Sequence, residues 1–148
     1  MESELYYFYK PSDPLLGAND VDFLNITEFL ADEPACKILW ELLDTQFRTR
    51  SKFLSIWPSV RYVAVQRDVE GSAAGFLLVS APVNWQIDYV VVRPDCRGQG
   101  IATKLLKATL HHAYVLKPPY VMLTSKESLR PLYESCGFSV VPCAVAVS

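Results

Sequence analysis

The period of the hydrophobic residues changes several times along this chain. An aromatic-rich run over residues 5–9, followed by the turn-prone letters KPSDP, predicts a strand and then a loop. A helical period over about 20–31 predicts a first helix, and a second helix should begin near Pro34, which suits a first helical turn. The N-terminal part of the chain is therefore expected to supply one strand and two short helices.

Strand patterns take over from residue 61 onward. Two apolar segments at 61–68 and 73–83 flank a turn at 70–72, and this arrangement predicts a hairpin. The next segment, 85–92, alternates at first and then becomes wholly apolar, which is typical of a central strand covered on both faces. We expect this strand in the middle of a sheet.

The last third of the chain begins with a helical period and ends in strands. Residues 101–116 predict an amphipathic helix, which the lysine and two prolines at 117–119 bring to an end. A strand over 120–125, a short helix over 128–137 and a closing strand over 138–147 follow. The order of strand, two helices, three strands, helix, strand, helix, strand predicts an α+β fold with a mixed sheet.

Length and charge narrow the classes of protein to consider. A chain of 148 residues with 51% hydrophobic content fits a single domain over residues 1–148. The net charge of -2 argues against a nucleic-acid partner. The N-terminus lacks the basic-then-apolar order of a signal peptide, and no apolar run approaches the roughly 20 residues that span a bilayer. We expect a cytoplasmic protein with no membrane association.

The four cysteines, Cys36, Cys96, Cys136 and Cys143, are widely spaced and form no CxxC pair. This spacing argues against a zinc site or a redox couple, so four reduced thiols and no metal are expected. Cys96 draws interest because it lies inside a glycine-containing loop.

That loop joins the predicted central strand to the long helix. Gly98 and Gly100 allow left-handed backbone angles and close approach of a ligand, while the first amides of the helix have no partners. The helix dipole favours an anion such as a pyrophosphate there, and Arg97 adds a positive charge. The loop matches neither the P-loop nor the GxGxxG pattern. A tight turn with no ligand is the alternative interpretation.

The surrounding segment, VVVRPDCRGQGIATKLL, resembles the acyl-CoA-binding motif of the GNAT superfamily of N-acetyltransferases. That motif has Gln or Arg, two residues, Gly, one residue, and then Gly or Ala, and Arg97, Gly100 and Ala102 fill those places. The downstream segment SLRPLYESCGF is similar to a second family signature, a short helix that bears a tyrosine and ends in Gly-Phe. The predicted order of elements matches that fold from about residue 5 to residue 147.

The resemblance implies that acetyl-CoA, or a close relative of it, is the acyl donor. The loop amides would hold the pyrophosphate, through Arg97, Gly98, Gln99, Gly100, Ile101 and Ala102. The pantetheine arm would lie along the preceding strand, which splays from its parallel neighbour 120–125 and offers backbone groups at Val90 and Val92. An amide near Val90 or Val91 would meet the oxyanion.

Acyl transfer to an amine also needs a base and an acid. Tyr133 stands where the family has its general acid. Asp88 is the candidate base, because a two-residue period puts it and Gln86 on the same face as Val90 and Val92. The family often has glutamate at one or both of these positions, so Gln86 and the shorter Asp88 depart from its pattern.

Other side chains near the predicted site have less defined roles. Lys126 stands where the family often has an asparagine, and it could reach a phosphate of the donor. His111 should face solvent on the long helix, so a surface position is expected for it. The tryptophans at 40, 57 and 85 could line the acceptor site, but their area favours the core.

Three functions therefore stay open at this stage. The first is an N-acetyltransferase that transfers acetyl directly to a primary amine of a small molecule or peptide. The second is a non-catalytic module of the same fold that binds or senses acyl-CoA. The third is a structural or partner-binding protein in which the glycine loop is only a turn. A homodimer is a further hypothesis, because the closing strand is short for its place in the sheet.

Overall fold

The computed structural model describes residues 4–11, 20–46, 57–81 and 84–141. Its strands form one sheet in the order β2-β3-β4-β5-β6-β1-β7. The strands are β1 Glu4–Tyr9, β2 Val21–Asn25, β3 Val60–Arg67, β4 Ala73–Ser80, β5 Trp85–Val92, β6 Val121–Lys126 and β7 Ser139–Val141. The helices are α1 Ile26–Leu30, α2 Glu33–Gln46, α4 Ile101–Leu116 and α5 Arg130–Ser135. The predicted α+β class with a mixed sheet is confirmed.

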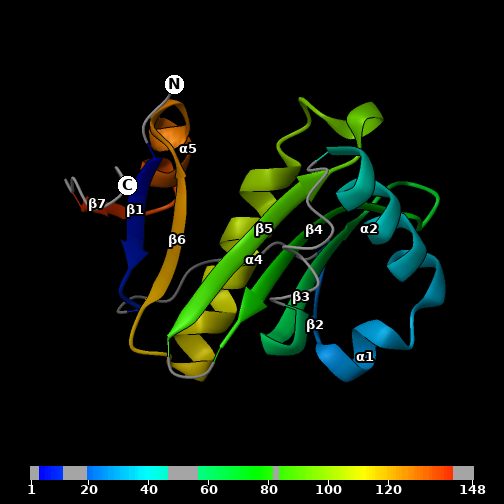
Figure 1. Ribbon diagram of the computed structural model, residues 1–148, viewed down its shortest axis with the longest axis horizontal. Coiled ribbons are helices and arrows are strands. Elements are labelled where there is room, and N and C mark those ends of the chain that lie inside the picture. The colour runs from blue at the N-terminus through cyan, green and yellow to red at the C-terminus, as the bar shows by residue number, and fades with distance from the viewer. Residues whose placement is uncertain (1–3, 12–19, 47–56, 82–83, 142–148) are drawn as a thin grey trace.

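The sheet has two halves that meet at its one parallel pair of described strands. Strands β2 to β5 run antiparallel to one another, whereas β5 and β6 are parallel, and β1 is antiparallel to both β6 and β7. In Figure 1 the half made of β1, β6, β7 and α5 stands apart from the half that carries α1 and α2. Helix α4 lies behind the sheet in the same view.

The core has two parts, one on each face of the sheet. The α4-side core includes Leu77, Val79, Ile87, Leu105 and Leu110 and extends to α5. The α2-side core lies under α1 and α2 and includes Phe29, Leu39, Val63, Phe76, Leu78 and Val91. Because both faces of β4 are buried, the strand is apolar from Ala73 to Val79 and ends in the buried Ser80, as expected for a central strand.

The prediction of a first helix over about 20–31 is wrong in its first half, because residues 21–25 form strand β2. Val21 pairs with Gln66 and Asn25 with Tyr62, so β2 extends the sheet beyond β3. The helix α1 begins only at Ile26, where the Asn25 side chain accepts a hydrogen bond from the Glu28 amide at 2.8 Å. The Asn-x-x-Glu capping box marks this start in the sequence. Over residues 21–25, pairing with β3 outweighs the helical period of the sequence.

The position of strand β1 in the sheet does not follow the order of the strands along the chain. It lies between β6 and β7, with Tyr7 opposite Leu123 on one side and Val140 on the other. The N-terminal strand therefore joins two C-terminal strands. The predicted closing strand is confirmed only over Ser139–Val141, because residues 142–147 lie outside the described part of the chain.

Helix α4 has the predicted bounds, Ile101–Leu116. Its buried stripe contains Leu105, Thr109 and Ala113, whereas Leu116 is 52% exposed at the C-terminal end. The helix packs closely on β4 at Gly75, where an added Cβ would lie 2.8 Å from Ile101 Cγ2. Within the described residues, no helix is long and apolar enough to cross a bilayer.

Candidate active site

The loop before α4 has the backbone geometry that its glycines suggest. Gly98 and Gly100 have φ angles of 79° and 74°, and a Cβ at either would meet no atom within 4 Å. Gly100 is the N-cap of α4, and no side chain caps this end. The loop and first helical turn line a cavity of about 160 Å³, through Val92, Cys96, Arg97, Gly98, Gly100, Ile101, Ala102 and Thr103.

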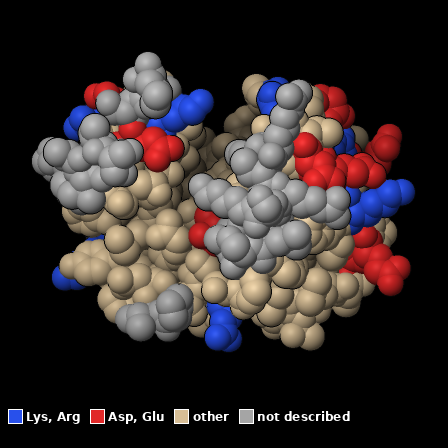
Figure 2. Space-filling view, viewed as in Figure 1, with Lys and Arg blue, Asp and Glu red and all other residues tan. Residues whose placement is uncertain are grey.

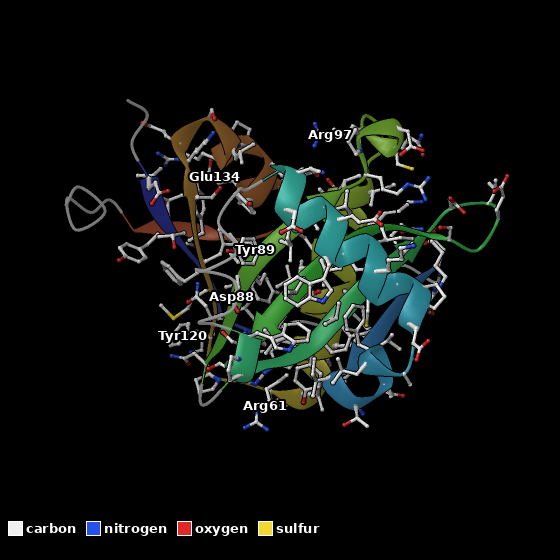
Figure 3. All side chains as sticks on the ribbon, turned by 45° about the vertical axis from the view of Figure 1, so that its right-hand side comes forward. Arg61, Asp88, Tyr89, Arg97, Tyr120 and Glu134 are labelled. Carbon is white, nitrogen blue, oxygen red and sulfur yellow. The ribbon has the colours of Figure 1, made fainter. Side chains whose placement is uncertain are left out.

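The cavity is suited to an anion. Among the described residues, the first backbone hydrogen bond of helix α4 runs from Lys104 N to Gly100 O at 3.1 Å. The amides of the loop and first helical turn that precede Lys104 are therefore available to a ligand. Their partial positive charge adds to that of the helix N-terminus. The exposed Arg97 side chain extends outward beside the loop in Figure 3. These features fit the diphosphate of CoA.

Arg93 holds the loop against the sheet. Its guanidinium donates to Asp68 at 2.9 Å and to Asp95 at 2.9 Å, and its backbone amide donates to Ala74 O at 2.7 Å. These carboxylates raise the pKa of Arg93, so it stays charged. The side chain also donates to the Cys96 sulfur at 3.2 Å. Arg93 therefore ties the loop to both the β3–β4 hairpin and β4.

A cleft opens between β5 and β6. Their parallel pairing is confined to Trp85 with Val121 and Gln86 with Met122, after which the strands separate. The predicted splay is thus present. The separation leaves a cavity of about 500 Å³, lined by Glu4, Ile87, Asp88, Tyr89, Val90, Leu123, Thr124, Ser125, Lys126, Leu129 and Tyr133. Figure 2 shows the surface furrowed between the two halves of the molecule.

The backbone of β5 offers unpaired groups to this cleft. Because Arg93 N bonds to Ala74 O, and bonded positions alternate along an antiparallel ladder, Val91 turns its peptide groups toward β4. Val90 and Val92 therefore turn theirs toward β6. The Val92 carbonyl accepts a hydrogen bond from the Gln46 side chain at 3.1 Å, so the end of α2 reaches this edge. The geometry fits an extended chain lying along β5.

Asp88 lies at a β-bulge in β5. Tyr89 pairs with Leu78 and Ile87 with Val79, so Asp88 is an extra residue on its strand. The expectation that Asp88 shares a face with Val90 and Val92 is wrong, because those valines pack on the same α4-side core as Ile87. The bulge reverses the alternation after Ile87. Asp88 faces the side of the sheet that carries α2, as Figure 3 shows.

The Asp88 carboxyl is held in an unusual environment. It accepts hydrogen bonds from the side chain and the amide of Ser80, yet its Oδ2 atom is buried and has no partner among the described residues. Burial raises the pKa of Asp88, against the opposing effect of the Ser80 hydrogen bonds. A carboxyl group with a raised pKa in the wall of a cleft is able to accept a proton.

Tyr133 lies on the other wall of the cleft. Its helix, α5, places the ring in the α4-side core, where the side chain is 7% exposed. Burial raises the pKa of Tyr133, while a hydrogen bond with the Ser125 side chain on β6 lowers it. The phenol is therefore protonated at neutral pH. Asp88 and Tyr133 thus line the same cavity from β5 and from the β6–α5 half of the molecule.

The other candidate residues fall into two groups. Lys126 lines the cleft at the C-terminal end of β6, whereas Gln86 lies below it, at the last paired position. The three tryptophans pack in or against the core, the position that their area favours. Trp85 is 5% exposed, and Trp40 and Trp57 are partly buried. They do not line the cleft.

The comparisons with known proteins agree with this geometry. Residues 58–140, more than half of the chain, match the model of the Acetyltransferase (GNAT) domain. The chain belongs to the GNAT acetyltransferase family. Enzymes of this family transfer an acyl group from acyl-CoA, and acetyl-CoA is the family's co-substrate.

Solved structures share the GNAT fold over most of this chain. A GCN5-related N-acetyltransferase from Sphaerobacter thermophilus is 19% identical, with a TM-score of 0.69 over 95% of this chain and 49% of its own. An IAA acetyltransferase from Bacillus cereus is 23% identical, with a TM-score of 0.61 over 80% of this chain and 77% of its own. At these identities the likeness shows the fold.

One curated relative shares a shorter segment with this GNAT chain. The [citrate [pro-3S]-lyase] ligase of Haemophilus influenzae is 33% identical over 55 residues. The match covers 37% of this chain and 16% of the ligase. The chain thus spans a small part of that relative and about half of the Sphaerobacter structure.

The sequence prediction missed four polar residues that support this GNAT site. They are Gln46, Ser80, Arg93 and Ser125. Arg93 carried a signal, since a charge between an apolar strand and Pro94 needs a partner. The other three carried none, because each contacts the site from a distant part of the chain and has an ordinary neighbourhood in the sequence.

Proposed function

We propose that this protein is an acetyl-CoA-dependent N-acetyltransferase that acetylates a primary amine of a small molecule or peptide by direct transfer. The observation that carries the proposal is the joint lining of one cleft by Asp88 and Tyr133, next to a loop of unpaired amides. A single domain over residues 1–148 contains all of these parts. The proposed acceptor is an amine because the cleft holds a carboxyl that can take its proton.

The donor would bind through the backbone of the loop and of β5. The loop amides and Arg97 would hold its phosphates, and the cleft-facing peptide groups of Val90, together with the Val92 amide, would hold its extended arm. Lys126, at the same end of the cleft, would contact a phosphate or the acceptor. Bound acetyl-CoA supplies an acyl group activated as a thioester.

Asp88 would act as the general base. An alkylammonium must lose a proton before it can attack a carbonyl, and the Asp88 carboxyl lines the cleft where that proton would be released. Its raised pKa brings the carboxyl closer to neutral pH, which favours proton transfer. The backbone amide of Val90, which faces the cleft, would stabilise the negative charge that develops on the acyl oxygen. Val91, the other residue that the sequence suggested for this role, turns its amide toward β4 instead.

Tyr133 would act as the general acid on the leaving group. A phenol that stays protonated can donate a hydrogen bond, and then its proton, to the departing sulfur. Ser125 would orient the phenol through their shared hydrogen bond. With Asp88 on the opposite wall, the proton would be taken up and delivered at separate points of one cavity.

The test is an assay of acetyl-CoA turnover with a panel of primary amines. Turnover is measured as the rate at which the CoA thiol is released. We expect the wild type to acetylate at least one class of amine, and Asp88→Asn and Tyr133→Phe each to lower kcat by roughly 100-fold or more. The matched control is Glu70→Gln, which changes an exposed carboxylate in the β3–β4 turn. Equal turnover by Tyr133→Phe and wild type would remove the tyrosine from the mechanism.

A further inference from the structure

The N-terminal strand brings a second tyrosine against the proposed acid. Tyr7 on β1 is completely buried, and its ring lies 4.8 Å from the ring of Tyr133, tilted by 47°. The Tyr7 hydroxyl donates a hydrogen bond to the Lys126 carbonyl at 3.1 Å. One side chain thus contacts both the catalytic tyrosine and the end of the strand that leads to its helix.

The helix that carries Tyr133 is too short to set the position of that side chain unaided. Helix α5 spans Arg130–Ser135, and no side chain caps its N-terminus. Isolated helices of this length are unstable, so packing determines where such a helix lies. The chain reaches it from β6 through the turn Glu127–Leu129, which begins next to the carbonyl that Tyr7 holds.

Contacts from separate strands surround the Tyr133 ring. Phe138, just before β7, meets it edge-on with centroids 5.9 Å apart. Ser125 of β6 binds the phenol group, and Tyr7 of β1 packs against the ring. Of these residues, Tyr7 alone comes from the N-terminal end of the chain. The position of Tyr133 therefore depends on β1 being inserted between β6 and β7.

We propose that Tyr7 is a positioning residue for acyl transfer, which holds the Tyr133 phenol at the cleft by packing against its ring and anchoring the end of β6. This inference rests on the proposed function, because it assumes that Tyr133 is the acid. It makes the N-terminal strand a working part of the active site. A displacement of about 1 Å of a catalytic group can cost roughly 100-fold in rate, so such support matters.

Three variants separate positioning from general packing. Tyr7→Phe keeps the ring and loses the hydroxyl, whereas Tyr7→Leu loses both. Tyr9→Leu is the matched control, because Tyr9 lies two residues away on the same face of β1, is 8% exposed, and packs against Phe138. We expect Tyr7→Leu to lower kcat at least tenfold with KM for acetyl-CoA within about twofold of wild type. Tyr7→Phe should lower kcat by less than Tyr7→Leu does, because it loses only the bond to the Lys126 carbonyl, and Tyr9→Leu should keep kcat.

A double-mutant cycle tests whether Tyr7 acts through Tyr133. In the Tyr133→Phe background, Tyr7→Leu should lower kcat no further, because the group it positions is already gone. Additive losses would overturn the inference while leaving the acid role of Tyr133 intact. If Tyr133→Phe alone retains full turnover, the proposed acid itself fails. The two failures are therefore distinguishable.

A readout without any acceptor uses ¹³C-labelled tyrosine and NMR. The groups that interact with the Tyr133 phenol are Ser125 from β6, Tyr7 from β1 and Cys136 beside α5. Loss of the Tyr7 ring exposes the phenol, so the alkaline titration of the Tyr133 resonance should move to lower pH in Tyr7→Leu. The same resonance should be unchanged in Tyr9→Leu. An unchanged resonance in folded Tyr7→Leu would contradict the proposal.

Discussion

Asp88 combines two features that conflict with stability and favour reactivity. It is an extra residue on its strand, and one of its carboxyl oxygens is buried with no partner among the described residues. Burial raises its pKa, which means that the folded protein disfavours the charged form. Sites of catalysis often retain groups that the fold itself would be more stable without. Asp88 fits that description.

A stability measurement tests this interpretation of Asp88. Because the folded-state pKa is raised, the carboxyl contributes most to stability at low pH, and the contribution is lost as pH rises through that pKa. Asp88→Asn should therefore be more stable than wild type at pH 7, with Tm higher by roughly 2–4 °C.

Thermal unfolding from pH 4 to 8 makes the comparison. The Tm difference between Asp88→Asn and wild type should shrink as pH falls, because the wild-type carboxyl then becomes neutral. Glu70→Gln, in an exposed turn, should show no such trend. A less stable Asp88→Asn at pH 7 would show that the carboxylate is satisfied in the folded state.

At the scale of elements, the loop before α4 depends on contacts made outside itself. Its glycines permit the turn, but Arg93 ties it to Asp68 of the hairpin and to Ala74 of β4. The close approach of Ile101 to Gly75 then sets where the first helical turn lies. The amides of the loop are aimed by the sheet, so remote contacts should control ligand affinity.

Arg93→Met tests this control without altering the loop amides. Loss of the ion pairs should weaken CoA binding about tenfold, because the loop would no longer be held in one position. Calorimetry with CoA measures the affinity. Arg67→Met is the matched control, since it removes ion pairs with Asp22 and Asp32 that lie outside the loop. Equal losses of affinity in both variants would point to a general loss of folding.

At the scale of the whole molecule, the splay of β5 from β6 divides the sheet, and the proposed catalytic groups lie on opposite sides of that division. Asp88 belongs to the half with α2, and Tyr133 to the half with β1 and β7. Backbone groups left unpaired by the splay are costly unless water or a ligand satisfies them. A donor that lies along β5 would supply partners to those groups and stabilise the folded protein.

Ligand-induced stabilisation is therefore expected with acetyl-CoA. At a concentration of about 100 times Kd, a ligand that binds only the folded state adds roughly 2.7 kcal/mol, which raises Tm by about 5–10 °C. Arg97→Glu should abolish most of this shift while leaving the Tm of the free protein close to wild type, because Arg97 is exposed. A thermal-shift series with acetyl-CoA and longer acyl-CoA species makes the measurement. An unchanged shift in Arg97→Glu would argue against the loop as the phosphate site.

Local patterns in the sequence determined most of the elements and the donor loop. The bounds of α4, the hairpin of β3 and β4, and the glycines at 98 and 100 all follow from periodicity and turn chemistry between near neighbours. The tyrosine helix was recognised in the same way. Residues 20–31 were the exception, because strand pairing with β3 changed the structure that their period favours.

Only the tertiary structure decided how these parts meet. The bulge at Asp88 reversed the face that simple alternation assigns, and it exists because of pairing with β4. Tyr7 reaches Tyr133 because β1 joins strands from the other end of the chain. Bulges and long-range pairings depend on the energy of the whole sheet, so no short stretch of sequence encodes them. The sequence therefore named the chemical groups, and the sheet set their positions.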